Sequence, residues 1–245
     1  MNLSLVKAQL APTGVLRAGI NMSNFLLVTS KDAQGEPDGV SPAIAKAVAE
    51  KLGVGVKLIT YPGPGALADA LKEDAWDIGN IANEKERAKT ICFSPAYSDI
   101  QATYLVPKGS NIKTIEDVDN PKVRIVAKER SAYDLWLTEN IKNAQIIRTK
   151  SIDESFKLFC EEGYEVLAGL RPKLLEEAAK LPGSTIIPGS FTVIGQSIGC
   201  KHGMPEAAQY LHEFVEESKR NGFISSLIEK YGVQGKLSTA ALTDL

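Results

Sequence analysis

The sequence predicts an α/β fold, because short β-rich segments alternate with segments whose apolar residues recur at helical spacing. In the first such unit, strands are predicted at 15–21 and 55–61 on either side of a helix at 41–53. Pro42 lies near the start of that helix and Gly53 lies just past its end, as helix boundaries favour. A strand–helix–strand unit of this kind predicts a parallel sheet with helices packed on it.

The first cycle of alternation continues beyond these three elements. A second helix at 65–74 leads into a strand at 76–81. The β-rich segment 102–112 contains Pro107 and Gly109, which interrupt a strand. We therefore expect this segment to leave one structural unit for another.

A second cycle of similar size follows the first. Its expected strands lie at 123–128, 144–150, 164–170 and 184–189, and its expected helices lie at 131–141, 151–163 and 172–181. Ser131 and Ser151 are expected to cap the first two of these helices, and Gly163 ends the second. The β-rich segment 192–203 then suits a return crossing toward the first cycle. Two helices are expected at the end of the chain, at 205–222 and 223–232.

Composition and charge exclude several classes of function. The chain has 245 residues, of which 44% are hydrophobic, so it can bury the core of one large or two ordinary domains. Its net charge is −2 and it has no long basic block, which argues against a nucleic-acid partner. No uninterrupted apolar window is long enough to span a bilayer, so we expect no membrane insertion.

The cysteines and histidines indicate neither a disulfide framework nor a bound metal, and no cofactor is predicted. Cys92, Cys160 and Cys200 are widely spaced and form no CxxC pattern, so we expect free and mostly buried thiols. The two histidines, His202 and His212, have no HExxH or clustered carboxylate pattern beside them.

Four motifs occur along the chain in a fixed order: GVSPAIAKAVAEKLG, ALKEDAWDIGNIANEKERAKTICFSPAY, IKTIEDVDNPKVRIVAKERSAYDLWL and KRNGFISSLIEKYG. With their spacing they resemble the type II (family 3) solute-binding proteins of amino-acid ABC transporters, over roughly residues 13 to 233. The resemblance implies a two-lobed periplasmic-binding-protein type II fold, in which each lobe has a central sheet flanked by helices and two hinge strands join the lobes. On that template, lobe 1 is residues 1–104 plus 197–245 and lobe 2 is residues 105–196, with hinges near 104–107 and 196–199.

Arg87 is the first candidate site residue. It lies six residues before the segment FSPAY, and the resemblance implies that an arginine at this place binds a ligand carboxylate. A planar guanidinium has paired donors that match two carboxylate oxygens and does not lose its charge, so lysine would replace it poorly. The alternative is an ordinary solvated charge, because acids and lysines flank Arg87 on both sides.

The turn ERSAYD, residues 129–134, is the second candidate. Ser131 is expected to cap the helix that continues with Ala132, and the backbone N–H groups of that N-terminus would form an anion site facing Arg87 from the other lobe. Capping alone also explains Ser131. Arg130 stands where the similar proteins usually have glycine, so either the turn differs or an additional cation faces the ligand.

The loop INMSNFLL after the first strand adds polar and aromatic candidates. The resemblance implies an aromatic that packs on the ligand, and Phe25 is the aromatic here, with Asn21 and Asn24 beside it as polar contacts. Tyr61, where the second predicted strand ends, is expected at the rim of the ligand site in the same way as Phe25. Core packing is the alternative for Phe25, since aromatic side chains dominate cores as well as ligand pockets.

Two departures from the family pattern bear on the ligand. Family members that bind α-amino acids usually have an aspartate where this chain has Leu170, and a buried ammonium group without an anionic partner is costly. The Ser and Thr that normally precede the arginine are replaced by Ala82 and Glu84. Either Glu84 receives an ammonium group, or the ligand is an organic acid whose second anionic group reaches Arg171 or Arg130. We prefer an amino-acid-like carboxylate.

These observations predict a monomeric binding protein, not an enzyme, which captures a small carboxylate by hinge closure for uptake through an ABC permease. One alternative is an enzyme similar to the cyclohexadienyl dehydratases, with Glu84 or Glu129 as the proton donor. The other is a cytosolic ligand sensor. The resemblance implies a periplasmic location, but the start of the sequence lacks the pattern of a secretory signal. Either the chain stays in the cytosol or its export signal is absent from this sequence.

Overall fold

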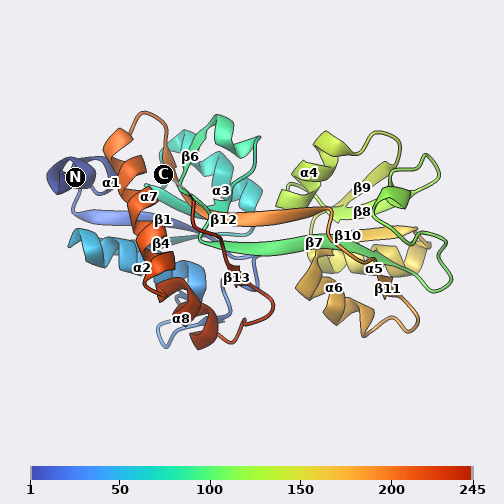
Figure 1. Cartoon of the computed structure of the whole chain (residues 1–245). Helices are drawn as coiled ribbons and strands as arrows, with labels where there is room; N and C mark the ends of the chain where they lie inside the picture. The colour runs from blue at the N-terminus through green and yellow to red at the C-terminus, as the bar shows by residue number, and fades with distance from the viewer. Residues whose placement is uncertain (1, 244–245) are drawn as a thin grey trace. The chain divides into compact units, whose positions relative to one another are not determined.

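The computed structural model describes residues 2–243, which form two compact units (Figure 1). Unit 1 contains the described residues up to Asp99 and from Gly195 onward, and unit 2 contains Ile100–Ile194. Each unit has a sheet with helices packed on it, so the α/β alternation predicted from the sequence is present in both.

The chain crosses between the units twice. It leaves unit 1 within strand β7 (Ser98–Val106) and returns within strand β12 (Thr192–Lys201). The lobe limits expected from the sequence, after residue 104 and after residue 196, fall inside the same two strands.

The sheet of unit 1 is built on three parallel strands. Their order is β4 (Gly55–Tyr61), β1 (Val15–Asn21) and β5 (Ile78–Ala82). β12 pairs antiparallel with β5 and also with the short strand β6 (Ile91–Phe93). The strands predicted at 15–21 and 55–61 are confirmed with these bounds.

The helices of unit 1 include all four that the sequence predicts in this part of the chain. The predicted four are α2 (Val40–Leu52), α3 (Pro64–Ala70), α7 (Pro205–Arg220) and α8 (Phe223–Lys230), and α1 (Leu3–Leu10) is additional. Two 3-10 turns, η1 (Leu71–Glu73) and η2 (Arg87–Lys89), also belong to this unit. Leu67 of α3 packs with Trp76, Ile81 and Ile91 in a buried cluster. Burial of this apolar surface holds the end of β5 in place, and the segment that carries Arg87 starts from that end.

Several short elements of unit 1 were not predicted. Helix α1 begins after Asn2, whose side-chain oxygen accepts hydrogen bonds from the N–H groups of Ser4 and Leu5, and it buries Val6 and Leu10. The strands β2 (Ser30–Lys31), β3 (Pro37–Asp38) and β13 (Ser238–Thr239) have two residues each. Elements this short carry no apolar periodicity by which a sequence pattern can identify them.

Unit 2 repeats the arrangement. Its parallel strands are β10 (Val166–Leu170), β8 (Arg124–Lys128) and β9 (Gln145–Thr149), and β7 pairs antiparallel with β10. The other elements are α4 (Ala132–Asn140), α5 (Ile152–Glu162), α6 (Arg171–Ala178), η3 (Glu116–Val118) and β11 (Thr185–Ile186). Figure 1 shows α4 on one side of this sheet and α5 and α6 on the other. The three helices predicted for this unit are confirmed.

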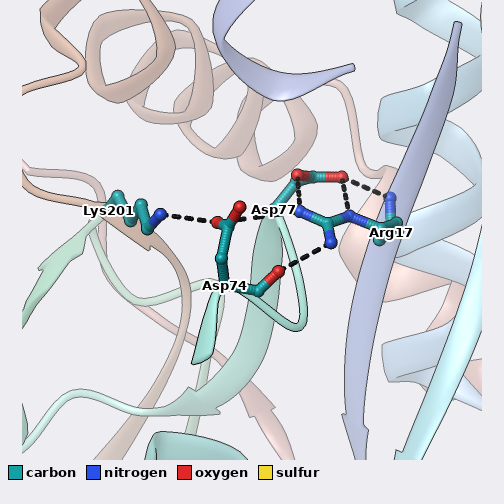
Figure 2. Close-up of polar contacts among 4 residues, drawn as sticks. All are labelled: Arg17, Asp74, Asp77 and Lys201. Carbon is teal, nitrogen blue, oxygen red and sulfur yellow. Dashed lines mark hydrogen bonds and ion pairs between the residues drawn. The ribbon is translucent and has the colours of Figure 1, made fainter. Parts of the chain in front are cut away.

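An arginine on the first strand of unit 1 is held by an acid at the start of the third (Figure 2). The Asp77 carboxylate accepts hydrogen bonds from the Arg17 backbone N–H (2.8 Å), Nε (3.1 Å) and Nη2 (2.7 Å). Arg17 Nη1 also donates to the backbone carbonyl of Asp74 (2.6 Å), and Lys201 of β12 donates to the Asp74 carboxylate (2.5 Å). These bonds tie β1, β5 and β12 together at the edge where β5 begins.

Unit 2 has the same pairing of an arginine and an acid between its first and third parallel strands. Glu165, which precedes β10, accepts hydrogen bonds from the backbone N–H (2.8 Å), Nε (2.9 Å) and Nη2 (2.7 Å) of Arg124 on β8. The Arg124 guanidinium lowers the pKa of Glu165 below its usual value. Because the contacts match those of Arg17 and Asp77 atom by atom, the two units are alike in how their first and third strands are joined.

We expect Asp77→Ala to lower the free energy of unfolding by about 2 kcal/mol, because three donors of Arg17 lose their acceptor. The Arg17 side chain is 33% exposed, so water compensates part of the loss. Urea unfolding measures the change. Asp69→Ala, which removes an exposed pair with Lys72, is the control and should cost less than about 0.5 kcal/mol; equal effects of the two substitutions would contradict the proposed role of Asp77.

A buried acid in unit 2 predicts a dependence of stability on pH. Glu177 of α6 is 2% exposed, and its burial raises its pKa to about 7, with partial compensation by Lys173. A raised pKa means that the stabilising contribution is complete below the unfolded value near 4.5 and is lost as the pH rises through 7.

Glu177→Gln is therefore expected to stabilise the protein by about 1–2 kcal/mol at pH 8, relative to the unsubstituted chain, and by much less at pH 5. Urea unfolding at the two pH values measures the difference. The exposed neighbour Glu176 gives the matched control, Glu176→Gln, which should not show this pH dependence. A stabilisation that is the same at both pH values would contradict the prediction.

The expectation that the thiols are mostly buried is wrong. Cys200 on β12 is buried, Cys92 on β6 is half-buried and Cys160 on α5 is exposed. Cys160 directly follows the buried Phe159, so the helix turns its side chain away from the core face. All three thiols are free in the structure.

Among residues 2–243, the structure contains no helix with both the length and the apolar character needed to cross a bilayer.

Candidate functional site

The three parallel strands of unit 1 end at one edge of its sheet. β1 ends at Asn21, which pairs in register with Tyr61 at the end of β4, and β5 ends at Ala82. Ligands of open α/β sheets bind outside the carboxyl ends of the strands, where the loops leave the sheet. Three of the residues predicted to bind a ligand therefore lie at the edge where such a ligand would be expected.

Arg87 is held at this edge and is not a solvated charge. It opens the 3-10 turn η2 and is 5% exposed, whereas Lys85, Glu86 and Lys89 around it are exposed. Its Nη1 donates a hydrogen bond to the carbonyl oxygen of Ala82 (3.1 Å), the last residue of β5. The alternative interpretation of Arg87 as an ordinary surface charge is wrong, and a role in ligand binding stays a prediction.

The segment that carries Arg87 is anchored to two strands. The Asn83 N–H donates to the Gly195 carbonyl on β12 (3.0 Å), and the Ala88 N–H donates to the Glu84 carbonyl (2.8 Å). Ala82 itself is buried, while Glu84 is half-buried. The first of these bonds attaches the start of the segment to β12, and the second closes the turn. The bond from Arg87 Nη1 to the last residue of β5 then gives the guanidinium a defined position.

The loop after β1 is shaped by the two asparagines that were predicted to contact a ligand. Asn21 Oδ1 accepts hydrogen bonds from the N–H (3.1 Å) and the hydroxyl (2.8 Å) of Ser23, and Asn24 Oδ1 accepts one from the Leu26 N–H (3.2 Å). Phe25, which directly follows Asn24, is half-buried and is not part of the buried core. The loop thus leaves an aromatic side chain only partly covered by this chain.

Tyr61 has a packing role. Its ring packs partly buried against the cluster that contains Leu67 and Trp76, and burial raises its pKa. Its backbone carbonyl accepts a hydrogen bond from the Met22 N–H (2.9 Å) and so also supports the loop after β1.

The second group of predicted residues lies at the carboxyl ends of the strands of unit 2. Ser131 follows β8 and caps α4: its hydroxyl accepts a hydrogen bond from the Asp134 N–H (3.1 Å) and donates one to the Lys128 carbonyl (2.8 Å). Ser131 and Ala132 are buried. The predicted cap is confirmed, and the N-terminus of α4 lies at the same edge as the ends of β8 and β10.

The turn at Arg130 keeps the backbone conformation that glycine would favour. Arg130 has φ +56, in the left-handed region, and its N–H donates to the Asp134 carboxylate (2.7 Å). Arg148 also donates to that carboxylate, from Nε at 2.9 Å. Asp134 was missed by the sequence interpretation, although Ser131 followed three residues later by an acid is the pattern of a capping box.

Leu170 and Arg171 lie where β10 passes into α6. Leu170 ends the strand and is half-buried, and Arg171 is the first residue of the helix. Arg171 Nε donates to the Gln101 side chain (2.7 Å), and its Nη2 donates to the Gly189 carbonyl. Arg171 thus donates both of these hydrogen bonds to residues of unit 2, where it joins α6 to β7.

The structure thus brings the twelve predicted residues into two groups, one in each unit. The first group is Asn21, Asn24, Phe25, Tyr61, Ala82, Glu84 and Arg87, and the second group is Arg130, Ser131, Ala132, Leu170 and Arg171. One buried polar residue beside the first group was not predicted as a contact: Gln196 of β12 pairs in register with Ala82. Within the described part of the chain, no three His, Cys, Asp or Glu side chains are arranged to hold a metal ion.

Comparison with known proteins agrees with this architecture. Residues 16–234 match the family model of the bacterial extracellular solute-binding proteins, family 3. A probable ABC transporter arginine-binding protein, ArtJ, from Chlamydia trachomatis is 24% identical over 241 aligned residues, which cover 90% of this chain and 91% of the relative.

Two solved structures show the same fold. One is a putative binding component of an ABC transporter from Wolinella succinogenes complexed with lysine (TM-score 0.75, 23% identity, 91% of this chain and 98% of that one). The other is the ancestral amino-acid-binding protein AncCDT-1, described as a precursor of cyclohexadienyl dehydratase (TM-score 0.74, 23% identity, 93% and 98%). The predicted fold class, that of the type II periplasmic binding proteins, is confirmed. Because the family model covers most of its length, the chain belongs to the bacterial extracellular solute-binding proteins, family 3.

Proposed function

We propose that this chain binds an amino acid, or a closely related carboxylate, and delivers it to the permease of an ABC transporter. The observation that carries the proposal is Arg87, a permanent cation that is 5% exposed and fixed to the carboxyl end of β5. A guanidinium in this position matches a carboxylate in charge and in geometry. The relatives support the ligand class, since their names describe arginine-binding, lysine-bound and amino-acid-binding proteins.

In the proposed mechanism, Arg87 of unit 1 takes the ligand carboxylate first. The ligand then contacts Ser131 and the N-terminal N–H groups of α4 in unit 2, which attract negative charge. Binding favours a closed arrangement only to the extent that the ligand touches both units, because equal affinity for two states shifts neither. Small-angle scattering should therefore show a smaller radius of gyration with ligand than without it.

Leu170 and Glu84 bear on whether the site can bind a ligand that carries an ammonium group. An α-ammonium group would find no acid at Leu170, which ends β10, whereas Glu84 lies three residues before Arg87 in the first group. We propose that Glu84 receives the ammonium group of an amino acid. A ligand without an amine is the alternative, and it would have a second anionic group near Arg130 or Arg171.

Isothermal titration calorimetry with a panel of amino acids, and with the same compounds lacking the α-amine, tests the proposal. We expect a dissociation constant of about 1 μM or below for at least one α-amino acid, and a weaker one for its deaminated counterpart. Glu84→Gln should reduce this preference for the amine. Absence of binding for every carboxylate in the panel would contradict the function, and a preference unchanged by Glu84→Gln would contradict the role of Glu84 alone.

A binding function is also better supported than catalysis on the same fold. A dehydratase would need a proton donor with a raised pKa. For Glu129, one of the two candidate donors, the pKa is instead lowered, chiefly because Lys150 donates a hydrogen bond to its carboxylate (2.8 Å). We propose that the chain acts on the extracellular side of the membrane, in agreement with the description of its family as extracellular. We further propose that it acts as a monomer.

A further inference from the structure

Two cysteines of unit 1 lie directly opposite each other on neighbouring antiparallel strands. Cys92 of β6 pairs in register with Cys200 of β12, between the pairs Phe93 with Gly199 and Ile91 with Lys201. Residues that face each other across an antiparallel pair project to the same side of the sheet. The two thiols therefore lie side by side, although roughly 110 residues of chain separate them.

The hydrogen-bond pattern fixes the spacing of the two backbones. The Ser94 N–H donates to the Ile198 carbonyl (2.9 Å), and the Ile198 N–H donates to the Ser94 hydroxyl (3.0 Å). The pair Ser94 with Ile198 therefore faces inward, as a hydrogen-bonded pair does, and so does the next alternate pair, Cys92 with Cys200, which lies two residues earlier on one strand and two residues later on the other. Such pairs have Cα atoms about 5.5 Å apart, within the range of about 4.4–6.8 Å that disulfides span. Their Cβ atoms are somewhat wider apart than in a relaxed disulfide, so the bond would be more easily reduced than most structural disulfides.

The two thiols differ in exposure. Cys92 is half-buried, whereas Cys200 is fully buried between β5 and β6. Burial raises the pKa of Cys200 to about 12, and the charge and hydrogen bond of the adjacent Cys92 thiol contribute to the same shift. The Cys92 thiol is thus the one that an external reagent meets first.

We propose that Cys92 and Cys200 form a disulfide between β6 and β12 when the protein meets a disulfide donor. Extracellular compartments are oxidising, and the family to which this chain belongs is described as extracellular. With glutathione disulfide, the Cys92 thiolate attacks one sulfur and releases one glutathione as its thiolate. The Cys200 thiolate then attacks the Cys92 sulfur of this mixed disulfide and releases the second glutathione. The protein loses two electrons and two protons, and the glutathione disulfide gains them.

Such a bond would join the strand that follows the Arg87 turn to the strand by which the chain re-enters unit 1. The loop that it closes includes all of unit 2, and closing a long loop restricts the unfolded chain strongly. We therefore expect oxidation to raise the midpoint of thermal unfolding by about 5 °C or more.

The experiment uses the full chain with Cys160→Ser, which removes the exposed thiol. The protein is incubated with glutathione disulfide at pH 8, quenched with acid, denatured in the presence of an alkylating agent and weighed by mass spectrometry. We expect a product without alkyl groups that is lighter by two hydrogen atoms than the reduced protein. Proteolysis should give one linked peptide pair that contains Cys92 and Cys200, and dithiothreitol should release it.

Two further variants in the same background separate the steps. With Cys200→Ala the reaction should stop at a glutathione adduct on Cys92, and with Cys92→Ala it should leave Cys200 a thiol that is alkylated only after denaturation. A persistent glutathione adduct on Cys92 while Cys200 is present, or two alkylated thiols after incubation, would overturn the proposal. The measurement on the Cys160→Ser protein decides the question even if Cys200→Ala does not fold.

Discussion

Arg87→Ala is expected to weaken binding of the carboxylate ligand by at least about 100-fold, or about 3 kcal/mol. The side chain is buried, so its charge is poorly screened by water, and the hydrogen bond to the Ala82 carbonyl holds it at the end of β5. Removing it takes away the positive charge that compensates the desolvated carboxylate. Calorimetry with the best ligand of the panel measures the loss.

Two further variants show whether the effect belongs to the guanidinium. Arg87→Lys keeps the charge but not the paired donors, so we expect an intermediate loss of about tenfold. Lys89→Ala removes an exposed cation from the same 3-10 turn, where it pairs with Glu86, and should leave affinity unchanged. Binding by a folded Arg87→Ala protein within about threefold of the original would remove Arg87 from the site.

The positions of the longer elements were predictable from the sequence because they depend on local periodicity. The strands at 15–21 and 55–61 and the helix that begins after Ser131 have the expected bounds or nearly so, since apolar spacing and capping residues are local signals. Helix α1 was missed. Its segment was considered only as an export signal, although Asn2 is a suitable N-cap.

The environment of the candidate residues was much less predictable. Arg87 is surrounded in sequence by exposed charges, so its burial depends on where β5 and β12 place the turn, which no local pattern records. The pairing of Arg17 with Asp77 and the register of Cys92 with Cys200 join segments far apart in the chain. Such contacts follow from strand order, and the sequence indicates strand order only through resemblance to proteins of known fold.

Gly39→Ala is the substitution from which we expect the largest loss of stability, about 3–4 kcal/mol. Gly39 is the N-cap of α2 and has φ +149, a backbone conformation that residues with a Cβ rarely adopt. A Cβ at this position would lie 2.4 Å from the carbonyl oxygen of Leu27 and 2.9 Å from the Cα of Val28. Both are backbone atoms, so no side-chain rotation relieves the overlap.

The Leu27 carbonyl also positions the loop that contains two of the candidate residues, so Gly39→Ala should reduce ligand affinity as well. The Leu27 carbonyl accepts a hydrogen bond from the Ser41 N–H (3.0 Å) in the first turn of α2, and this bond holds the loop that carries Asn24 and Phe25. A displaced carbonyl would break that bond and move the loop.

Gly35→Ala is the matched control, because Gly35 has φ +81 but no atom within 4 Å of the added Cβ. It should cost only about 1 kcal/mol, from backbone strain alone. Urea unfolding of both variants separates strain from overlap. If the two glycines proved equally tolerant of alanine, the close approach of Leu27 to the start of α2 would not be what holds the loop at the carboxyl edge of the sheet.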